Sequence, residues 1–231
     1  MDLLWPSVAL VVLVVGLFLA ERRWPVGVAK LEENIIALLL ALITLISFVQ
    51  VVARYGFNSG WGGALEATRI LFAWLILFGM SYGVRTGLHL GVDAVIRLFP
   101  RPLFKAAAIF GALCTLAYGL ILLHSGFLAI FGVDVGGNWR QSGAIGYWNF
   151  MFDRGTGLDD LRYPNWVSET FGVQERVQRW VAYLMLPIGL ALLSFRSLQA
   201  VIAIALGERE LIVASHEAEE LVSENLNTLK E

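Results

Sequence analysis

Long runs of apolar residues without a charged side chain constrain this chain more than any other feature. Five such runs are separated by polar stretches, and only the fifth is interrupted, by Arg196. The runs are Leu3–Ala20, Asn34–Ala53, Ile70–Val84, Ala106–Val133 and Trp180 to about Ala200. Because about 20 apolar residues in a helix cross the hydrocarbon core of a bilayer, the pattern predicts an all-α integral membrane protein with five spans.

The composition agrees with this fold class. Hydrophobic residues make up 58% of the 231 positions and charged residues 16%, whereas soluble domains have about 45–50% and about 25%. The formal net charge of −2 leaves no basic surface for phosphates, which argues against a nucleic-acid partner. The only cysteine, Cys114, cannot form an internal disulfide.

The first run, Leu3–Ala20, allows two interpretations. A signal peptide would need a basic start and a small residue near its cleavage site, but Asp2 is the only early charge and Phe18 is bulky. We therefore interpret the run as a retained membrane helix. A polar connection from Glu21 to Glu33 is expected to follow, with Pro25 ending the helix.

The other spans are expected at about 34–53, 67–84, 106–132 and 180–200. In the last span, Pro187 predicts a kink. Arg196 lies about 16 residues into that span, and we expect its long side chain to reach the cytoplasmic headgroups.

A long loop, residues 134–179, separates the last two spans. Loops of this length are usually functional or disordered. Trp139, Trp148 and Trp166 lie within it, so we expect a folded excursion at the membrane surface. Its final part, Asn165–Arg179, has the pattern of a short amphipathic helix.

Basic residues set the expected orientation, because short cytoplasmic connections carry more lysine and arginine than external ones. The connections after the first and third spans hold three and four basic residues, against two after the second. They are Arg22, Arg23 and Lys30; Arg85, Arg97, Arg101 and Lys105; and Arg54 and Arg69. The pattern predicts an external N-terminus and a cytoplasmic tail.

The segment Glu66–Asp93 is the central helix with a polar cluster at each end. Glu66 and Arg69 are three residues apart, so they can meet on one helix face. Gly79 and Gly83 are four apart and form a small-residue face on which another membrane helix can pack closely. We expect this helix to contact another subunit. The candidate contacts are Glu66, Arg69, Trp74, Gly79, Gly83, Arg85, Gly87, His89 and Asp93.

Enzyme chemistry finds no support in the sequence. It contains no Cys-x-x-Cys, no His-Glu-x-x-His and no glycine-rich phosphate loop before a helix. We therefore expect a non-catalytic protein without a metal or cofactor. The alternative is a haem-binding membrane anchor of a respiratory or other oxidoreductase complex, with His89 and His124 as candidate ligands. Their expected depths differ by about 27 Å, so they cannot share one iron.

Part of the central helix resembles a known family. Its residues follow the spacing E-x7-W-x4-G-x7-G-x-H, carried by Glu66, Trp74, Gly79, Gly87 and His89. This spacing resembles the signature of the small membrane subunit (DctQ type) of tripartite ATP-independent periplasmic (TRAP) transporters. The run FGMSYGVRTGLHLGVD is most similar to the dicarboxylate branch. With QVVARYGFN and WVAYLMLPIGLALLSFRSLQ, the resemblance covers about Leu31–Leu206.

The resemblance implies a division of the chain and a role. Residues 1–30 would be an added N-terminal membrane helix, 31–206 a four-span core with a periplasmic insertion at 134–179, and 207–231 an acidic cytoplasmic tail. The chain would lie in the bacterial inner membrane, surrounded by lipid, and brace a large permease subunit (DctM-type). That subunit would perform sodium-coupled uptake of a C4-dicarboxylate-like organic acid, which a periplasmic binding protein (DctP-type) delivers.

Overall fold

The computed structural model describes residues 4–86, 100–126, 128, 132 and 142–207. Gly87, His89 and Asp93, predicted from the sequence as partner contacts, lie outside the described residues, as does the tail from residue 208 onward.

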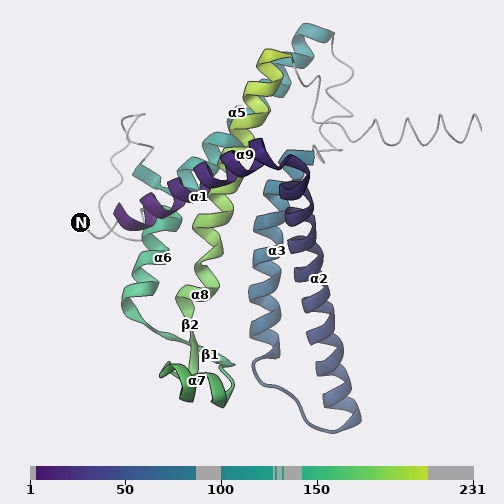
Figure 1. Ribbon diagram of the computed structural model, residues 1–231, viewed down its shortest axis with the longest axis vertical. Coiled ribbons are helices and arrows are strands. Elements are labelled where there is room, and N and C mark those ends of the chain that lie inside the picture. The colour runs from purple at the N-terminus through teal and green to yellow at the C-terminus, as the bar shows by residue number, and fades with distance from the viewer. Residues whose placement is uncertain (1–3, 87–99, 127, 129–131, 133–141, 208–231) are drawn as a thin grey trace, which may run out of the picture.

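Five helical spans in the described part are long and apolar enough to cross a membrane, which confirms the predicted fold class. Four of them are single helices (Figure 1): α1 (Leu4–Arg23), α2 (Pro25–Gly56), α3 (Ala64–Thr86) and α5 (Arg101–Leu123). The fifth combines the short α8 (Arg179–Tyr183) with α9 (Met185–Leu206).

The first two helices meet at Trp24 without a polar loop between them. Pro25 lies at the start of α2, where its fixed φ suits a helix and its missing N–H is not needed. The predicted connection from Glu21 to Glu33 is therefore wrong, because its residues are helical apart from Trp24. Glu32 is buried against other helices, while Arg22, Arg23, Lys30 and Glu33 stay exposed on the helix surface, so the polar stretch is accommodated without a loop.

The fourth span is shorter at its end than the predicted range 106–132. α5 starts at Arg101 and ends at Leu123, where His124 turns to an extended backbone and its Nδ1 accepts the N–H of Gly126 at 3.0 Å. Gly143, with φ +81°, lies against this helix end; a Cβ there would be 2.8 Å from the Leu122 carbonyl oxygen. The close approach of the next element therefore marks the end of α5.

The last span is interrupted three residues before Pro187. α8 ends at Tyr183 and α9 begins at Met185. Pro187 has no N–H for the Tyr183 carbonyl, four residues earlier, so the helical ladder is interrupted there. The backbone of Leu184 at the interruption stays in the right-handed helical region, so a kink at Pro187 stays a prediction.

α9 is the central helix of the bundle. In its span, 56% of the most apolar window is buried, against 6% for α2. α3 packs closely on α9 at Gly189, where a Cβ would lie 2.7 Å from the Leu77 Cβ. α5 packs on α9 where a Cβ at Gly119 would lie 2.6 Å from the Ser194 Oγ. The glycines therefore set the close approach of three helices.

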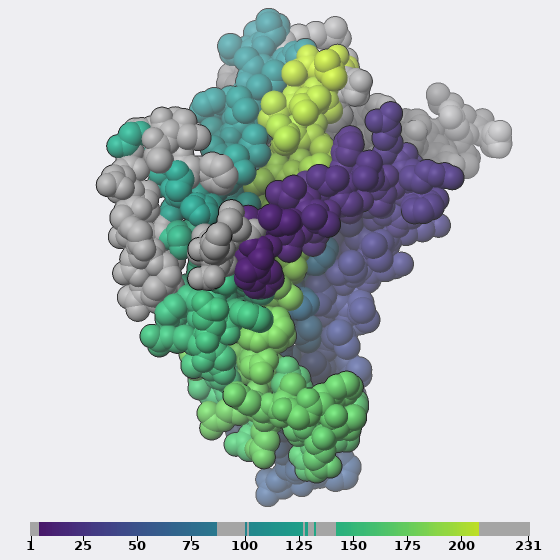
Figure 2. Space-filling model, turned by 60° about the vertical axis from the view of Figure 1, so that its left-hand side comes forward, coloured from purple at the N-terminus to yellow at the C-terminus, as the bar shows by residue number. Residues whose placement is uncertain are grey.

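α1 crosses α9 obliquely and does not run parallel to α2 and α3 (Figure 1). In the space-filling view it forms a band between the excursion and the start of α2 (Figure 2). Trp5 packs edge-on against Trp148 of α6 (Gly143–Arg154), with 5.2 Å between ring centroids. Phe18 packs on Phe195 of α9 at 6.4 Å. α1 thus joins the excursion to the central helix.

The excursion is folded in its described part, residues 142–179. After α6 come β1 (Gly157–Arg162), α7 (Asn165–Phe171) and β2 (Arg176–Gln178), and the two strands pair antiparallel. The predicted helix over Asn165–Arg179 is correct only for its first half. Gly172 ends α7 in the left-handed region (φ +60°), and the residues that follow return to pair with β1.

Candidate functional site

A buried arginine joins three helices near one end of the bundle. Arg196 of α9 is 2% exposed. Its Nη1 donates to both carboxylate oxygens of Glu21 on α1, each at 2.7 Å, and its Nη2 donates to Glu32 on α2. The planar guanidinium thus holds two carboxylates from two different helices.

A second arginine completes the group. Arg85 of α3 donates from Nη1 to the other oxygen of Glu32 at 2.7 Å, and its Nε lies 3.9 Å from Glu21. Gln199 of α9 accepts from Arg196 at 2.7 Å and donates to Glu21 at 3.0 Å. We call these five residues the ion-pair network. Its two cations and two anions balance, which is the arrangement that buried charges require.

The network corrects the sequence-based expectation for Arg196. We predicted that its side chain would extend to the cytoplasmic headgroups, but it turns inward to the two glutamates. Both terminal nitrogens of the guanidinium meet fixed acceptors there, whereas its buried Nε has no hydrogen-bond partner among the described residues. The cost of desolvation is offset by two carboxylates rather than one.

The ion-pair network has a structural role: it holds helices together. Each of its four charged side chains is neutralised by a neighbour. Together they leave no unbalanced charge for a substrate ion. A cavity of about 470 Å³ adjoins it, lined by network residues together with Glu33, Thr86 and Ala203. Tyr82 donates to Glu33 at this edge, with a long O–O distance of 3.4 Å. The network therefore fixes α1 and α2 to the α3–α9 core.

A second anchor lies at the opposite end of α3. Both carboxylate oxygens of Glu66 accept backbone N–H groups of β1: Asp159 at 3.2 Å, Asp160 at 2.9 Å and Leu161 at 2.7 Å. The spacing allows Glu66 to meet Arg69, but among the described residues the carboxylate bonds these three backbone donors and shows no ion pair with Arg69. The three N–H groups are held in place by the strand, whereas an arginine side chain on the same helix would have to be ordered to bond the carboxylate.

Two further residues support this anchor. Gly63 lets the strand approach, because a Cβ there would lie 3.0 Å from the Leu161 Cα. Arg179 donates from Nε to the Gly157 carbonyl at 3.1 Å and from Nη2 to Asp159 at 3.1 Å. The β1–β2 hairpin is thus held by α3 on one side and by Arg179, at the start of the last span, on the other.

The remaining predicted contacts divide into two groups. Trp74 is engaged within the chain, where its indole N–H donates to the Ala182 carbonyl at 3.2 Å. Gly79 and Gly83 face open space, since a Cβ at either position meets nothing within 4 Å. Arg69 is exposed on α3. The described residues hold no group of three or more histidine, cysteine, aspartate or glutamate side chains that could bind a metal ion.

Comparison with known proteins decides the family. The sequence profile described as "Tripartite ATP-independent periplasmic transporters, DctQ component" matches residues 43–207, which is more than half of the chain. The chain belongs to the DctQ family. It is accordingly a transporter component of the inner membrane and not an enzyme, so the respiratory-anchor alternative is wrong.

Named relatives support the assignment. A protein of Vibrio cholerae called C4-dicarboxylate TRAP transporter small permease protein DctQ is 36% identical over 213 residues, covering 87% of this chain and 84% of the relative. A protein of the same name from Pseudomonas aeruginosa is 30% identical over 203 residues, covering 76% and 83%. No solved structure matches this DctQ-family chain significantly.

Three members of the network, Glu21, Glu32 and Gln199, escaped the sequence analysis. A signal for them was present: Arg196 sits alone inside an apolar run, and a buried cation needs an anion. The partners are 175 and 164 residues away. Both glutamates also precede the region matched by the family profile, whereas Arg85 and Arg196 lie within it.

Proposed function

We propose that this chain is the small permease subunit of a TRAP transporter that takes up C4-dicarboxylates in a sodium-coupled reaction. The observation that carries the proposal is its 36% identity, over 87% of its length, to a relative named for that activity. The chain would work with a large permease subunit, which holds the transport chemistry, and with a periplasmic binding protein.

The ion-pair network supports a bracing role. A subunit that stays fixed while its partner moves needs helices that do not shift against one another. The network and the Glu66 anchor lock α1, α2, α3, α9 and the hairpin together at two ends. Such internal pairing suits a scaffold better than a substrate pathway, which needs polar groups that are free to bind.

The face of α3 that carries Gly79 and Gly83 is the proposed contact with the large subunit. These two glycines touch no other described part of the chain, so a partner helix has room to pack closely there. Arg69 adds an exposed charge on the same helix, and Gly87, His89 and Asp93 continue the segment along the sequence. Glu66, Trp74 and Arg85 have internal partners, and we leave them out of this interface.

The proposed topology follows from the basic connections. Residues 1–30 form the added N-terminal helix, 31–206 the membrane core, and 207–231 a cytoplasmic tail. The insertion at 134–179 lies on the periplasmic side, where it is available to the binding protein.

Reconstitution tests the function. The chain, its large permease and its binding protein are assembled in liposomes with an inward sodium gradient, and uptake of labelled succinate is measured. We expect uptake only when all three proteins are present, and none with this chain alone. Uptake that persists without this chain, or a preference for an acid of another class over succinate, malate and fumarate, would contradict the proposal.

A further inference from the structure

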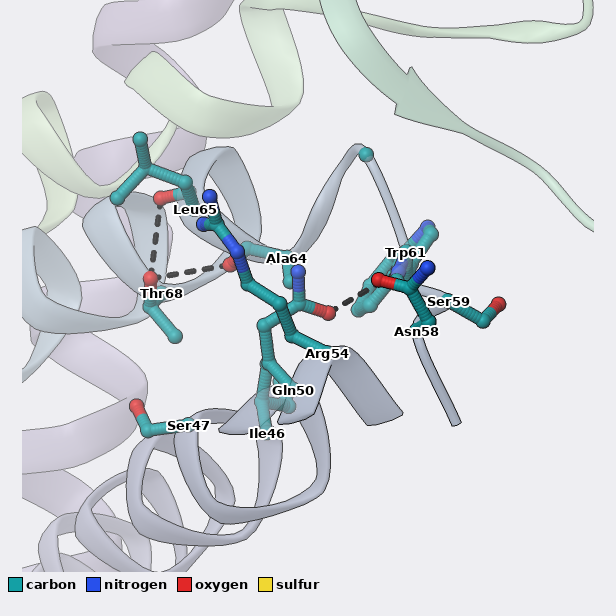
Figure 3. Close-up of a pocket in the computed structure, with 12 residues that line it drawn as sticks. Ile46, Ser47, Gln50, Arg54, Asn58, Ser59, Trp61, Ala64, Leu65 and Thr68 are labelled. Atoms are coloured by element: carbon teal, nitrogen blue, oxygen red, sulfur yellow. Dashed lines mark hydrogen bonds between the residues drawn. The ribbon is translucent and has the colours of Figure 1, made fainter. Parts of the chain in front are cut away.

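A polar cavity lies between the end of α2 and the start of α3, at the loop that joins these two helices and away from the ion-pair network. Its volume is about 670 Å³, within the range of about 300–1,000 Å³ that small-molecule sites occupy. Figure 3 shows the twelve lining residues. They are Ile46, Ser47, Gln50, Arg54, Asn58, Ser59, Gly60, Trp61, Gly62, Ala64, Leu65 and Thr68.

The charge of this lining is one-sided. Arg54 is the cation, and none of the twelve described lining residues is acidic. Arg54 extends from the last turn of α2 toward the first turn of α3 (Figure 3). The other polar groups are neutral amides and hydroxyls. The lining therefore favours a ligand with one negative charge and several hydrogen-bonding groups.

The loop that closes the cavity is held in shape. The Gln50 Oε1 accepts the backbone N–H of Trp61 at 3.0 Å, which ties the loop to α2 (Figure 3). Asn58 adopts the left-handed backbone (φ +47°), a conformation that asparagine tolerates better than most residues. Thr68 donates its hydroxyl to the Ala64 and Leu65 carbonyls at 3.0 Å, so its oxygen remains an acceptor.

The surroundings indicate that the ligand is a lipid. Tyr55, Phe57 and Trp61 are 83%, 78% and 47% exposed beside the cavity, as aromatic residues are at the headgroup level of a membrane. Below them, the exposed faces of α2 and α3 are apolar, at Phe48 and Phe72 among others. A headgroup in the cavity would leave its acyl chains along these faces.

We propose that this cavity, the hairpin cavity, binds the headgroup of an anionic phospholipid of the phosphatidylglycerol kind. The phosphodiester pairs with Arg54, and the glycerol hydroxyls bond to the neutral side chains around it. Ethanolamine and choline lipids fit less well, because their ammonium group would meet no carboxylate in the lining. Such a lipid would fill the space between the end of α2 and the start of α3.

Native mass spectrometry of the purified full chain tests this. Dioleoyl phosphatidylglycerol, phosphatidylethanolamine and phosphatidylcholine are titrated separately. We expect phosphatidylglycerol to bind about fivefold more tightly than the other two, because one arginine near a headgroup contributes about that factor. Equal binding of the three lipids overturns the proposal.

Matched variants locate the binding. Arg54→Gln should lower phosphatidylglycerol affinity about fivefold, to the level of the other lipids, while Arg54→Lys retains most of it. Arg23→Gln removes an exposed cation from α1, far along the chain from the cavity lining, and should change nothing. Asn58→Gly removes an amide but keeps the left-handed backbone, and should weaken binding of the glycerol headgroup specifically. If Arg54→Gln and Asn58→Gly both bind like wild type, the cavity is not the site.

Soluble anions distinguish a lipid from a free ligand. Glycerol 3-phosphate and succinate are added at the same concentrations, and thermal unfolding of the chain is followed. We expect protection by phosphatidylglycerol and none by either soluble anion, since neither has chains to bury. Equal protection by a soluble anion would replace the lipid assignment with a site for free carboxylate or phosphate.

Discussion

Arg196 and Glu32 are 164 residues apart in sequence, yet they form an ion pair in the interior where α9 passes α2. The same guanidinium holds Glu21 of α1. Helices from the two ends of the chain therefore share one charged junction. This junction adds charged contacts to the aromatic packing of α1 on α6 and α9.

Removing Arg196 should be strongly destabilising. Arg196→Met leaves the buried Glu32 and the half-buried Glu21 with Arg85 alone, and breaking a buried pair from one side costs about 3–5 kcal/mol. Arg196→Lys keeps the charge but cannot bond both carboxylates in a plane, so we expect an intermediate loss. Unfolding of the purified chain in detergent measures both. Arg23→Met, an exposed arginine stacked on Trp24, is the control; equal stability of all three would refute this structural role of the network.

The contributions of Arg196 and Glu32 to the free energy of unfolding should be coupled. Arg196→Met combined with Glu32→Met removes a cation and an anion together, so its cost should be smaller than the sum of the single changes by about 0.5–3 kcal/mol. A complete double-mutant cycle in the free energy of unfolding provides the measurement. Strict additivity would mean that the two side chains do not interact in solution.

Glu66 should stabilise the β1–β2 hairpin locally and contribute little to the stability of the whole chain. Glu66→Ala leaves three β1 N–H groups without their acceptor; two of these hydrogen bonds are exposed and only that of Leu161 is part-buried, so we expect a total cost of about 1–3 kcal/mol. Trypsin should then cleave at Arg162 and Arg176 faster than in wild type, while the main unfolding transition moves little. Glu169→Ala, an exposed change on α7, serves as the control. Unchanged cleavage in Glu66→Ala would show that the carboxylate does not hold the strand.

Substitutions at Gly79 of α3 and Gly189 of α9 should differ in their effect on the stability of the isolated chain. Gly79→Leu points into open space and should leave the isolated chain stable, yet it should reduce co-purification of the large permease subunit by blocking close packing. Gly189→Ala should destabilise the isolated chain, because its Cβ would lie 2.7 Å from the Leu77 Cβ. The two measurements are thermal unfolding and recovery of the partner at matched expression. Full partner retention in Gly79→Leu would exclude this face as the interface.

Local pattern was sufficient for the number of spans, the helix interruption before Pro187 and the family. Each of these depends on residues that are neighbours in sequence: an apolar run of membrane length, a missing N–H, or a motif within 24 residues from Glu66 to His89. Helix ends were predicted less well. The first helix ends just before Pro25, as predicted, but a second helix begins at Pro25 at once, and α5 stops at Leu123 inside an apolar run.

The sequence by itself therefore determined that this DctQ-family chain is a helical membrane protein of a TRAP transporter. Only the tertiary structure decided what its charges do. Whether Arg196 reaches for headgroups or for glutamates depends on which helices lie beside it. Whether Glu66 bonds Arg69 or a strand depends on how an excursion almost 100 residues later folds back. Apolar burial acts along each helix and is visible in a local window, but an ion pair depends on distance in space, which no local pattern specifies.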